Sequence, residues 1–78
     1  MTQIKADLTL DARGLNCPMP LLKLKQKLNA MASQQVIEVL TTDQGSVRDF
    51  AAFVKQANHE TLDFSENGAE YRFIIKKH

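Results

Sequence analysis

The spacing of apolar residues changes from a period of two to a helical period at residues 15–20, and this change constrains the fold more than any other feature. The segment holds the single cysteine, Cys17, and both prolines of the chain, Pro18 and Pro20. Proline is tolerated in the first turn of a helix, where N–H groups have no intrahelical partner, and disrupts later turns. The sequence therefore predicts a helix that begins at Pro18 or at Pro20, directly after a strand and a turn.

The residues before this segment have the pattern of a strand. Apolar residues occupy every second position, at Ile4, Ala6, Leu8 and Leu10. This period of two indicates one buried and one solvated face. Residues 11–14 break the pattern, and Gly14 allows a turn conformation that other residues rarely adopt.

Two later segments have helical spacing. The first places Leu21, Leu24, Leu28, Met31 and Ala32 on one face and is predicted to run to about Ala32. The second places Val47, Phe50, Ala51, Val54 and Ala57 on one face and is predicted to end at Asn58 and His59. We expect Ser46 and Asp49 to form a capping box at its start.

Three further strands complete the pattern. Residues 36–42 are a nearly continuous β-branched run, typical of a central strand. Asn67 and Gly68 lie between two alternating runs, which is a strong signal for a hairpin. A two-residue loop at this position would pair Glu66 with Ala69, Phe64 with Tyr71 and Leu62 with Phe73.

The predicted fold class is an α/β (α+β) two-layer sandwich with the order β-α-β-α-β-β, in a single domain over residues 1–78. A chain of 78 residues has room for one modest core and no deep substrate cavity. Right-handed crossovers place both helices on one face of the sheet. The last strand can then lie between the second and third, which gives a mixed four-stranded sheet of order 1-2-4-3 with a polar uncovered face.

Composition excludes several classes of function. Ten Lys and Arg residues against nine Asp and Glu give a net charge of +1, so we expect no direct nucleic-acid binding and no membrane binding. RNA binding is the weaker alternative, because the basic residues cluster only at Lys76 and Lys77. The N-terminus lacks the apolar core of a signal peptide, and a lone free thiol suits a reducing compartment, so a cytoplasmic location is predicted.

Cys17 is the candidate reactive residue. The thiolate is the nucleophile, and a helix N-terminus favours that charge by about 0.3–1 kcal/mol, to which Arg13 or a partner's charge could add. The alternative is a cysteine buried as a small hydrophobe. Thiol catalysis needs a base, and His59 and His78 are too far away in the predicted fold to serve. No metal-ligand spacing is present, so we expect no metal.

The outer side of the first helix is the candidate docking surface. Met19 and Leu22 project away from the predicted core and would form an apolar patch beside the thiol, with Lys23 and Arg13 at its rim. Isolated exposed apolar residues are common, so this pattern alone is weak.

Residues 11–20 read Asp-Ala-Arg-Gly-Leu-Asn-Cys-Pro-Met-Pro. This segment resembles the Asp-x-x-Gly-x-x-Cys-Pro-x-Pro signature of the TusA/SirA family of small sulfur carriers, and the resemblance covers the whole chain. It implies that Cys17 accepts sulfane sulfur as a persulfide and passes it to an acceptor protein, with Asp11, Gly14, Pro18 and Pro20 as supporting residues. It also implies a cysteine desulfurase or other sulfur donor, a monomeric carrier and no cofactor.

The pathway is less specific than the chemistry. The best-known route of the family ends in 2-thiouridine in tRNA, while relatives are implicated in sulfur oxidation, molybdenum-cofactor supply and regulation. Met19, Asn16 and Gln44 depart from the residues typical of that route. The alternative function is a regulatory or adaptor domain in which Cys17 is at most a redox switch, so whether the protein is an enzyme in the strict sense stays open.

Overall fold

Six elements make up the computed structural model, which describes residues 5–78. They are the strand β1 (Leu8–Ala12), the helix α1 (Met19–Ala30), the strand β2 (Val36–Thr41), the helix α2 (Gly45–Gln56) and the strands β3 (Glu60–Asn67) and β4 (Glu70–Lys76). The predicted order β-α-β-α-β-β is confirmed. Ile4, which we expected in the first strand, lies outside the described residues.

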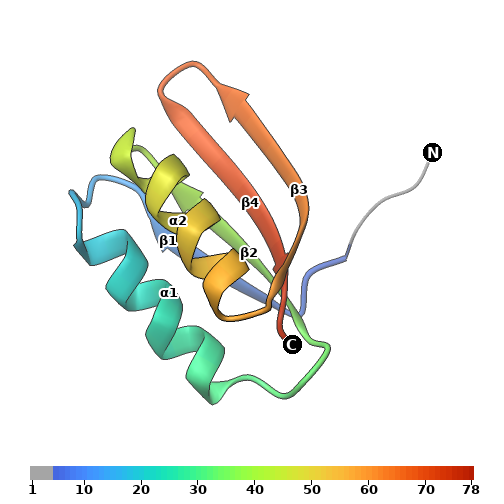
Figure 1. Ribbon diagram of the computed structural model, residues 1–78. Helices are drawn as coiled ribbons and strands as arrows, with labels where there is room; N and C mark the ends of the chain where they lie inside the picture. The colour runs from blue at the N-terminus through green and yellow to red at the C-terminus, as the bar shows by residue number, and fades with distance from the viewer. Residues whose placement is uncertain (1–4) are drawn as a thin grey trace.

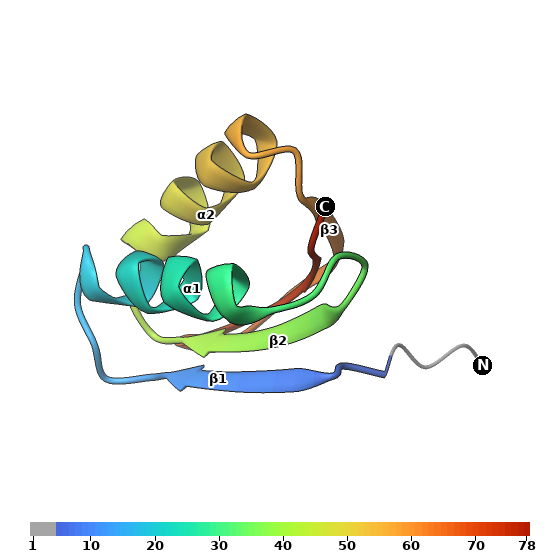
Figure 2. The ribbon, with the colours of Figure 1, turned by 90° about the horizontal axis from the view of Figure 1, so that it is seen from below.

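The four strands form one mixed sheet in the predicted order β1-β2-β4-β3. β1 and β2 run parallel, and β4 lies antiparallel between β2 and β3. Figures 1 and 2 show both helices on the same face of this sheet. This arrangement follows from two right-handed crossovers, as the sequence predicts.

The core lies between the helices and the covered face of the sheet. It includes the buried residues Leu10, Ala12, Leu24, Leu28, Met31, Ile37, Val39, Phe50, Val54, Tyr71, Phe73 and Ile75. The rings of Phe50 and Phe73 lie with their centroids 4.6 Å apart, which joins α2 to β4. These residues come from every second strand position and from one side of each helix, as the two periods predict.

The uncovered face is polar except for three apolar residues, Val36 and Leu40 on β2 and Ile74 on β4. Ile74 points away from the core and is nevertheless only 1% exposed. It lies across from Glu38 on β2 and Asp63 on β3, and Arg72 forms ion pairs with both carboxylates. The prediction of a polar face therefore needs correction, because charged neighbours surround a buried isoleucine and two half-buried apolar side chains of β2 lie on the same face.

The predicted hairpin register is wrong by two residues. Phe64 pairs with Phe73 and Glu66 with Tyr71, and the loop consists of Gly68 and Ala69. Gly68 has a φ of 63°, a conformation that glycine adopts readily, while Asn67 remains in the strand. A shift of two residues keeps Phe64 on the core side, so the alternation survives the error. An irregularity between Thr61 and Asp63 was not predicted.

Several predicted boundaries and buried positions are also corrected. β1 begins only at Leu8, which is 40% exposed at the start of an edge strand. α1 ends at Ala30, because the N–H of Met31 bonds back to the carbonyl of Leu28 at 3.1 Å, and Ala32 is exposed. In α2, Ala51 is exposed as well.

Candidate functional site

Cys17 lies in the turn that joins β1 to α1, with its side chain exposed. α1 begins at Met19, with Pro18 at the cap and Pro20 as the second, buried helical residue. The predicted starts of this helix, at Pro18 or at Pro20, are therefore each wrong by one residue. The carbonyl of Pro18 accepts the first helical hydrogen bond from Leu22 at 3.1 Å, and the N–H of Met19 donates to the carbonyl of Asn16 at 2.9 Å. Cys17 therefore stands one residue before the cap, joined to Pro18 by a cis peptide bond.

Gly14 fixes the path of the turn. Its φ is 82°, a region in which a side chain would be strained. Its N–H donates to Oγ1 of Thr42 at 2.8 Å, just beyond the end of β2. The turn that carries Cys17 is thereby joined to the neighbouring β2–α2 turn.

Asp11 and Arg13 form a clamp at the base of the same turn. Nε and Nη2 of Arg13 donate to the two carboxylate oxygens of Asp11 at 2.9 and 3.0 Å, and the N–H of Arg13 also donates to this carboxylate. These hydrogen bonds lower the pKa of Asp11 to about 2. Nη1 of Arg13 lies 3.7 Å from Glu70. The Arg13 guanidinium is therefore paired with two carboxylates, which leaves its expected role beside the thiol unsupported.

The thiol of Cys17 contacts a carboxylate that the sequence analysis assigned elsewhere. Sγ of Cys17 donates to Oδ2 of Asp49 at 2.9 Å. This hydrogen bond raises the pKa of Cys17. Partial desolvation and the negative charges of Asp49 and Asp43 also raise this pKa, whereas the positive charge of Arg48 lowers it. The predicted activation of the thiol by the helix start is thus wrong for the free protein, because the carboxylates outweigh it.

The predicted capping box at the start of α2 is also wrong. α2 begins at Gly45, and Ser46 is buried. Oγ of Ser46 lies 2.7 Å from Oγ1 of Thr41 and donates to the carbonyl of Asp43 at 2.7 Å. The carboxylate of Asp43 in turn accepts the N–H of Cys17 at 3.1 Å. The β2–α2 turn therefore holds the cysteine backbone, while Asp49 from the helix holds its thiol.

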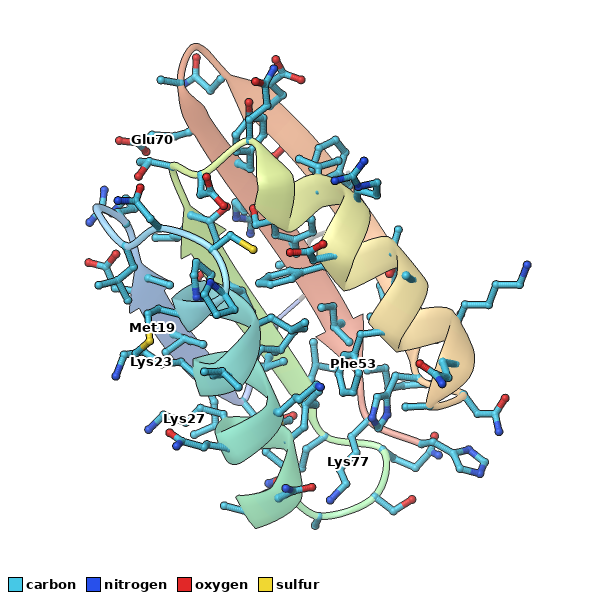
Figure 3. All side chains as sticks on the ribbon, turned by 60° about the vertical axis from the view of Figure 1, so that its left-hand side comes forward. Met19, Lys23, Lys27, Phe53, Glu70 and Lys77 are labelled. Carbon is cyan, nitrogen blue, oxygen red and sulfur yellow. The ribbon has the colours of Figure 1, made fainter. Side chains whose placement is uncertain are left out.

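The outer side of α1 carries the candidate docking surface. Met19 is 43% exposed and Leu22 is 44% exposed, as the helical spacing predicts, and Lys23 is half-buried. Figure 3 shows Met19, Lys23 and Lys27 in succession along one side of this helix. An apolar and basic strip thus begins two residues after the thiol.

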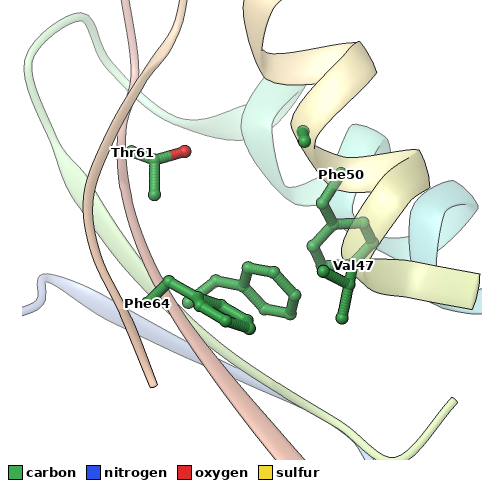
Figure 4. Close-up of a pocket in the computed structure, with 6 residues that line it drawn as sticks. Val47, Phe50, Thr61 and Phe64 are labelled. Carbon is green, nitrogen blue, oxygen red and sulfur yellow. The ribbon is translucent and has the colours of Figure 1, made fainter. Parts of the chain in front are cut away.

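An apolar hollow of about 180 Å³ lies between α2 and β3 (Figure 4). It is lined by Val47, Phe50, Ala51, Thr61, Phe64 and Phe73. Phe64 is 42% exposed there. This hollow is open and small, so the expectation of no deep substrate cavity stands beside it, and Cys17 is not among the lining residues.

The two histidines lie together beyond the C-terminal end of α2. Nδ1 of His59 accepts the N–H of His78 at 3.1 Å. Within residues 5–78, no group of three or more His, Cys, Asp or Glu side chains is arranged to hold a metal ion. None of the helices in the described part of the chain has the length and hydropathy to cross a membrane.

Asp43 and Asp49 are the site residues that the sequence analysis missed. A usable signal was present, since β1 and β2 were expected to be parallel neighbours. Parallel strands end at the same edge of a sheet, so the turns that follow them lie side by side. Polar residues after β2 could therefore have been assigned to the surroundings of Cys17.

The fold and the site together define a class of small two-layer α+β proteins that present one exposed thiol at the start of the first helix. The family model described as "Sulfurtransferase TusA" matches residues 8–77. The chain belongs to this TusA family.

Individual relatives agree with this assignment. The chain is 54% identical over 71 residues to a protein from Allochromatium vinosum named sulfur carrier protein TusA, covering 91% of this chain and 93% of the relative. It is 39% identical over 74 residues to the putative sulfur carrier protein YrkI of Bacillus subtilis, covering 95% and 99%. A crystal structure of a SirA-like protein from Desulfitobacterium hafniense has the same fold, with a TM-score of 0.78 at 20% identity over 88% of this chain and 95% of that one.

Proposed function

We propose that this protein is a sulfur carrier in which Cys17 accepts sulfane sulfur as a persulfide from a donor protein and passes it to an acceptor protein. The observation that carries the proposal is the exposed thiol of the single cysteine, held between two turns at the edge of the sheet. Family membership supports it, because the relatives are named sulfur carrier proteins.

The proposed reaction is a thiol exchange. The Cys17 thiolate attacks the outer sulfur of a donor persulfide, the S–S bond of the donor breaks, and the donor cysteine leaves as a thiolate. The product is a persulfide on Cys17, and the proton lost from Cys17 balances the one taken up by the donor. No oxidant or reductant is consumed. The acceptor's thiolate then removes the outer sulfur by the same step.

The setting of this exchange is also part of the proposal. We assign the donor to the cysteine desulfurases or another persulfide-forming protein, and the carrier acts as a cytoplasmic, monomeric single domain without a cofactor. Synthesis of 2-thiouridine in tRNA is the first destination to examine. Asp11, Arg13, Gly14, Pro18 and Pro20 support the turn from which Cys17 projects.

Intact mass spectrometry tests the carrier function. Incubation with a cysteine desulfurase and free cysteine is expected to add one sulfur atom to the protein, and Cys17→Ser is expected to abolish the adduct. A reducing agent should remove the added sulfur, because the S–S bond of a persulfide is reducible. Absence of an adduct with several sulfur donors would instead favour the adaptor function, with Cys17 as a redox switch.

The docking surface of Met19, Leu22 and Lys23 gives a second prediction. Leu22→Glu places a charge on the apolar part of this surface and is expected to slow sulfur loading about tenfold, the effect of about 1.4 kcal/mol of lost docking energy. Leu8→Glu is the matched control, because Leu8 is 40% exposed but lies at the opposite end of β1 from the cysteine turn. Equal loading rates for the two variants would remove Leu22 from the docking surface.

A further inference from the structure

Asp49 is the side chain that contacts the reactive sulfur. Its Oδ2 lies 2.9 Å from Sγ of Cys17, in the range of a direct hydrogen bond. Asp49 belongs to α2, whereas Cys17 precedes α1, so the contact depends on the packing of two elements that are far apart in sequence. Asp49 is half-buried.

Most of the charges around the Cys17 thiol are negative and disfavour its thiolate form. Asp49 at the sulfur and Asp43 at the backbone N–H of Cys17 are both carboxylates, and Arg48 is the cation that opposes them. The thiol is the donor in the contact with Asp49, so the shared proton is on the sulfur. A thiolate formed beside these two carboxylates would lose the hydrogen bond and be repelled.

We propose that Asp49 restrains the unloaded carrier by holding Cys17 as a hydrogen-bonded thiol, and that the sulfur donor relieves the restraint by presenting a cationic side chain to this carboxylate. The relief of the restraint by the donor rests on the proposed carrier function, whereas the restraint by Asp49 does not. A cation beside Asp49 weakens its hold on the thiol proton and favours the thiolate. Sulfur loading of Cys17 then depends on a partner that supplies this cation, while small electrophiles react slowly because the sulfur remains protonated.

The loaded state differs from the unloaded state at the same contact. Once the outer sulfur is bonded to Sγ, Sγ carries no proton and cannot donate to Asp49. The proton released from Cys17 passes to the departing donor thiolate, so atoms and charge balance. The carboxylate then faces an anionic persulfide and repels it toward solvent, where an acceptor thiolate can attack its outer sulfur.

Asp49→Asn tests the restraint without any donor protein. Asparagine keeps the size of the side chain and removes its charge. We expect the rate of Cys17 alkylation by iodoacetamide at pH 7.5 to rise several-fold, and the midpoint of the rate against pH to move down. The gain in rate is smaller than the gain in thiolate, because a thiolate of lower pKa is a weaker nucleophile. Asp63→Asn, which removes a carboxylate from the uncovered side of the sheet, is expected to change neither quantity.

The wild-type protein provides a measurement that needs no variant. If Asp49 restrains the thiol, folded protein is alkylated more slowly than urea-unfolded protein at the same pH. Equal rates in the two states, or an Asp49→Asn profile that coincides with the wild-type profile, would overturn the restraint.

Sulfur loading tests the cationic donor. If the donor neutralises Asp49, Asp49→Asn loads no faster from a cysteine desulfurase than wild type, although it is alkylated faster. Loading that accelerates by the same factor as alkylation would overturn the donor's part of the proposal. A wild-type protein that takes up no sulfur would instead contradict the carrier function, while the alkylation result would stand.

Discussion

Phe50→Ala is expected to lower the free energy of unfolding by about 3–5 kcal/mol, the usual cost of removing a buried phenylalanine side chain. Phe50 is 1% exposed, and its ring packs against Phe73 with the centroids 4.6 Å apart. A domain of this size has a total stability of about 4–12 kcal/mol. The variant is therefore expected to lose a large part of its stability.

Urea denaturation followed by circular dichroism measures this loss as a lower midpoint at an unchanged slope. Phe53→Ala on the same helix is the matched control. Phe53 is half-buried and contacts His59 and Lys25 at the edge of the core, so a cost of about 1 kcal/mol is expected. Similar midpoints for the two variants would contradict the assignment of Phe50 to the centre of the core.

The consequence for function comes through α2. Phe50 anchors the helix to the sheet, and the next residue in the N-terminal direction is Asp49, which contacts the thiol. Partial loosening of α2 in Phe50→Ala is expected to separate Asp49 from Cys17 before the whole domain unfolds. Increased alkylation of Cys17 in urea concentrations below the midpoint would report this local change.

The fold could be predicted because its determinants are local or topological. The alternation at Leu8 and Leu10 and the spacing of Leu24 and Leu28 each follow from the period of one element. The sheet order follows from the handedness of crossovers and the hairpin at Gly68, with no need for any particular side-chain contact. The two-residue error in the hairpin register left the order intact, because it kept Phe64 on the core side, although the irregularity between Thr61 and Asp63 leaves Leu62 without its predicted partner.

The state of the thiol could not be predicted in the same way. The helix start was assigned an activating effect, but the N–H of Met19 is already occupied by the carbonyl of Asn16. The decisive group, Asp49, had a plausible local role three residues after Ser46. The strand order could place Asp49 near the cysteine turn, but its direct contact with the sulfur depends on tertiary packing. A direct hydrogen bond from the thiol to a carboxylate outweighs a dipole effect at an exposed position, so the pKa of Cys17 is raised rather than lowered.

The buried hydroxyl pair of Thr41 and Ser46 gives the second large effect. Both side chains are at most 2% exposed, and their oxygens lie 2.7 Å apart. Ser46→Ala leaves the Thr41 hydroxyl without this partner in an apolar surrounding. The free energy of unfolding is therefore expected to fall by about 1–3 kcal/mol, the penalty for an unsatisfied buried polar group.

A double-mutant cycle separates this penalty from a simple loss of packing. Thr41→Val combined with Ser46→Ala removes both hydroxyls, so the pair of changes is expected to cost clearly less than the sum of the single changes. The carbonyl of Asp43 keeps its hydrogen bond from the N–H of Ser46, at 3.0 Å, in every variant. Additive costs in urea denaturation would show that the hydroxyls contribute independently. A combined cost below the sum of the single costs would show that the hydroxyl pair stabilises the β2–α2 turn as a unit. This turn holds the backbone of Cys17 through Asp43.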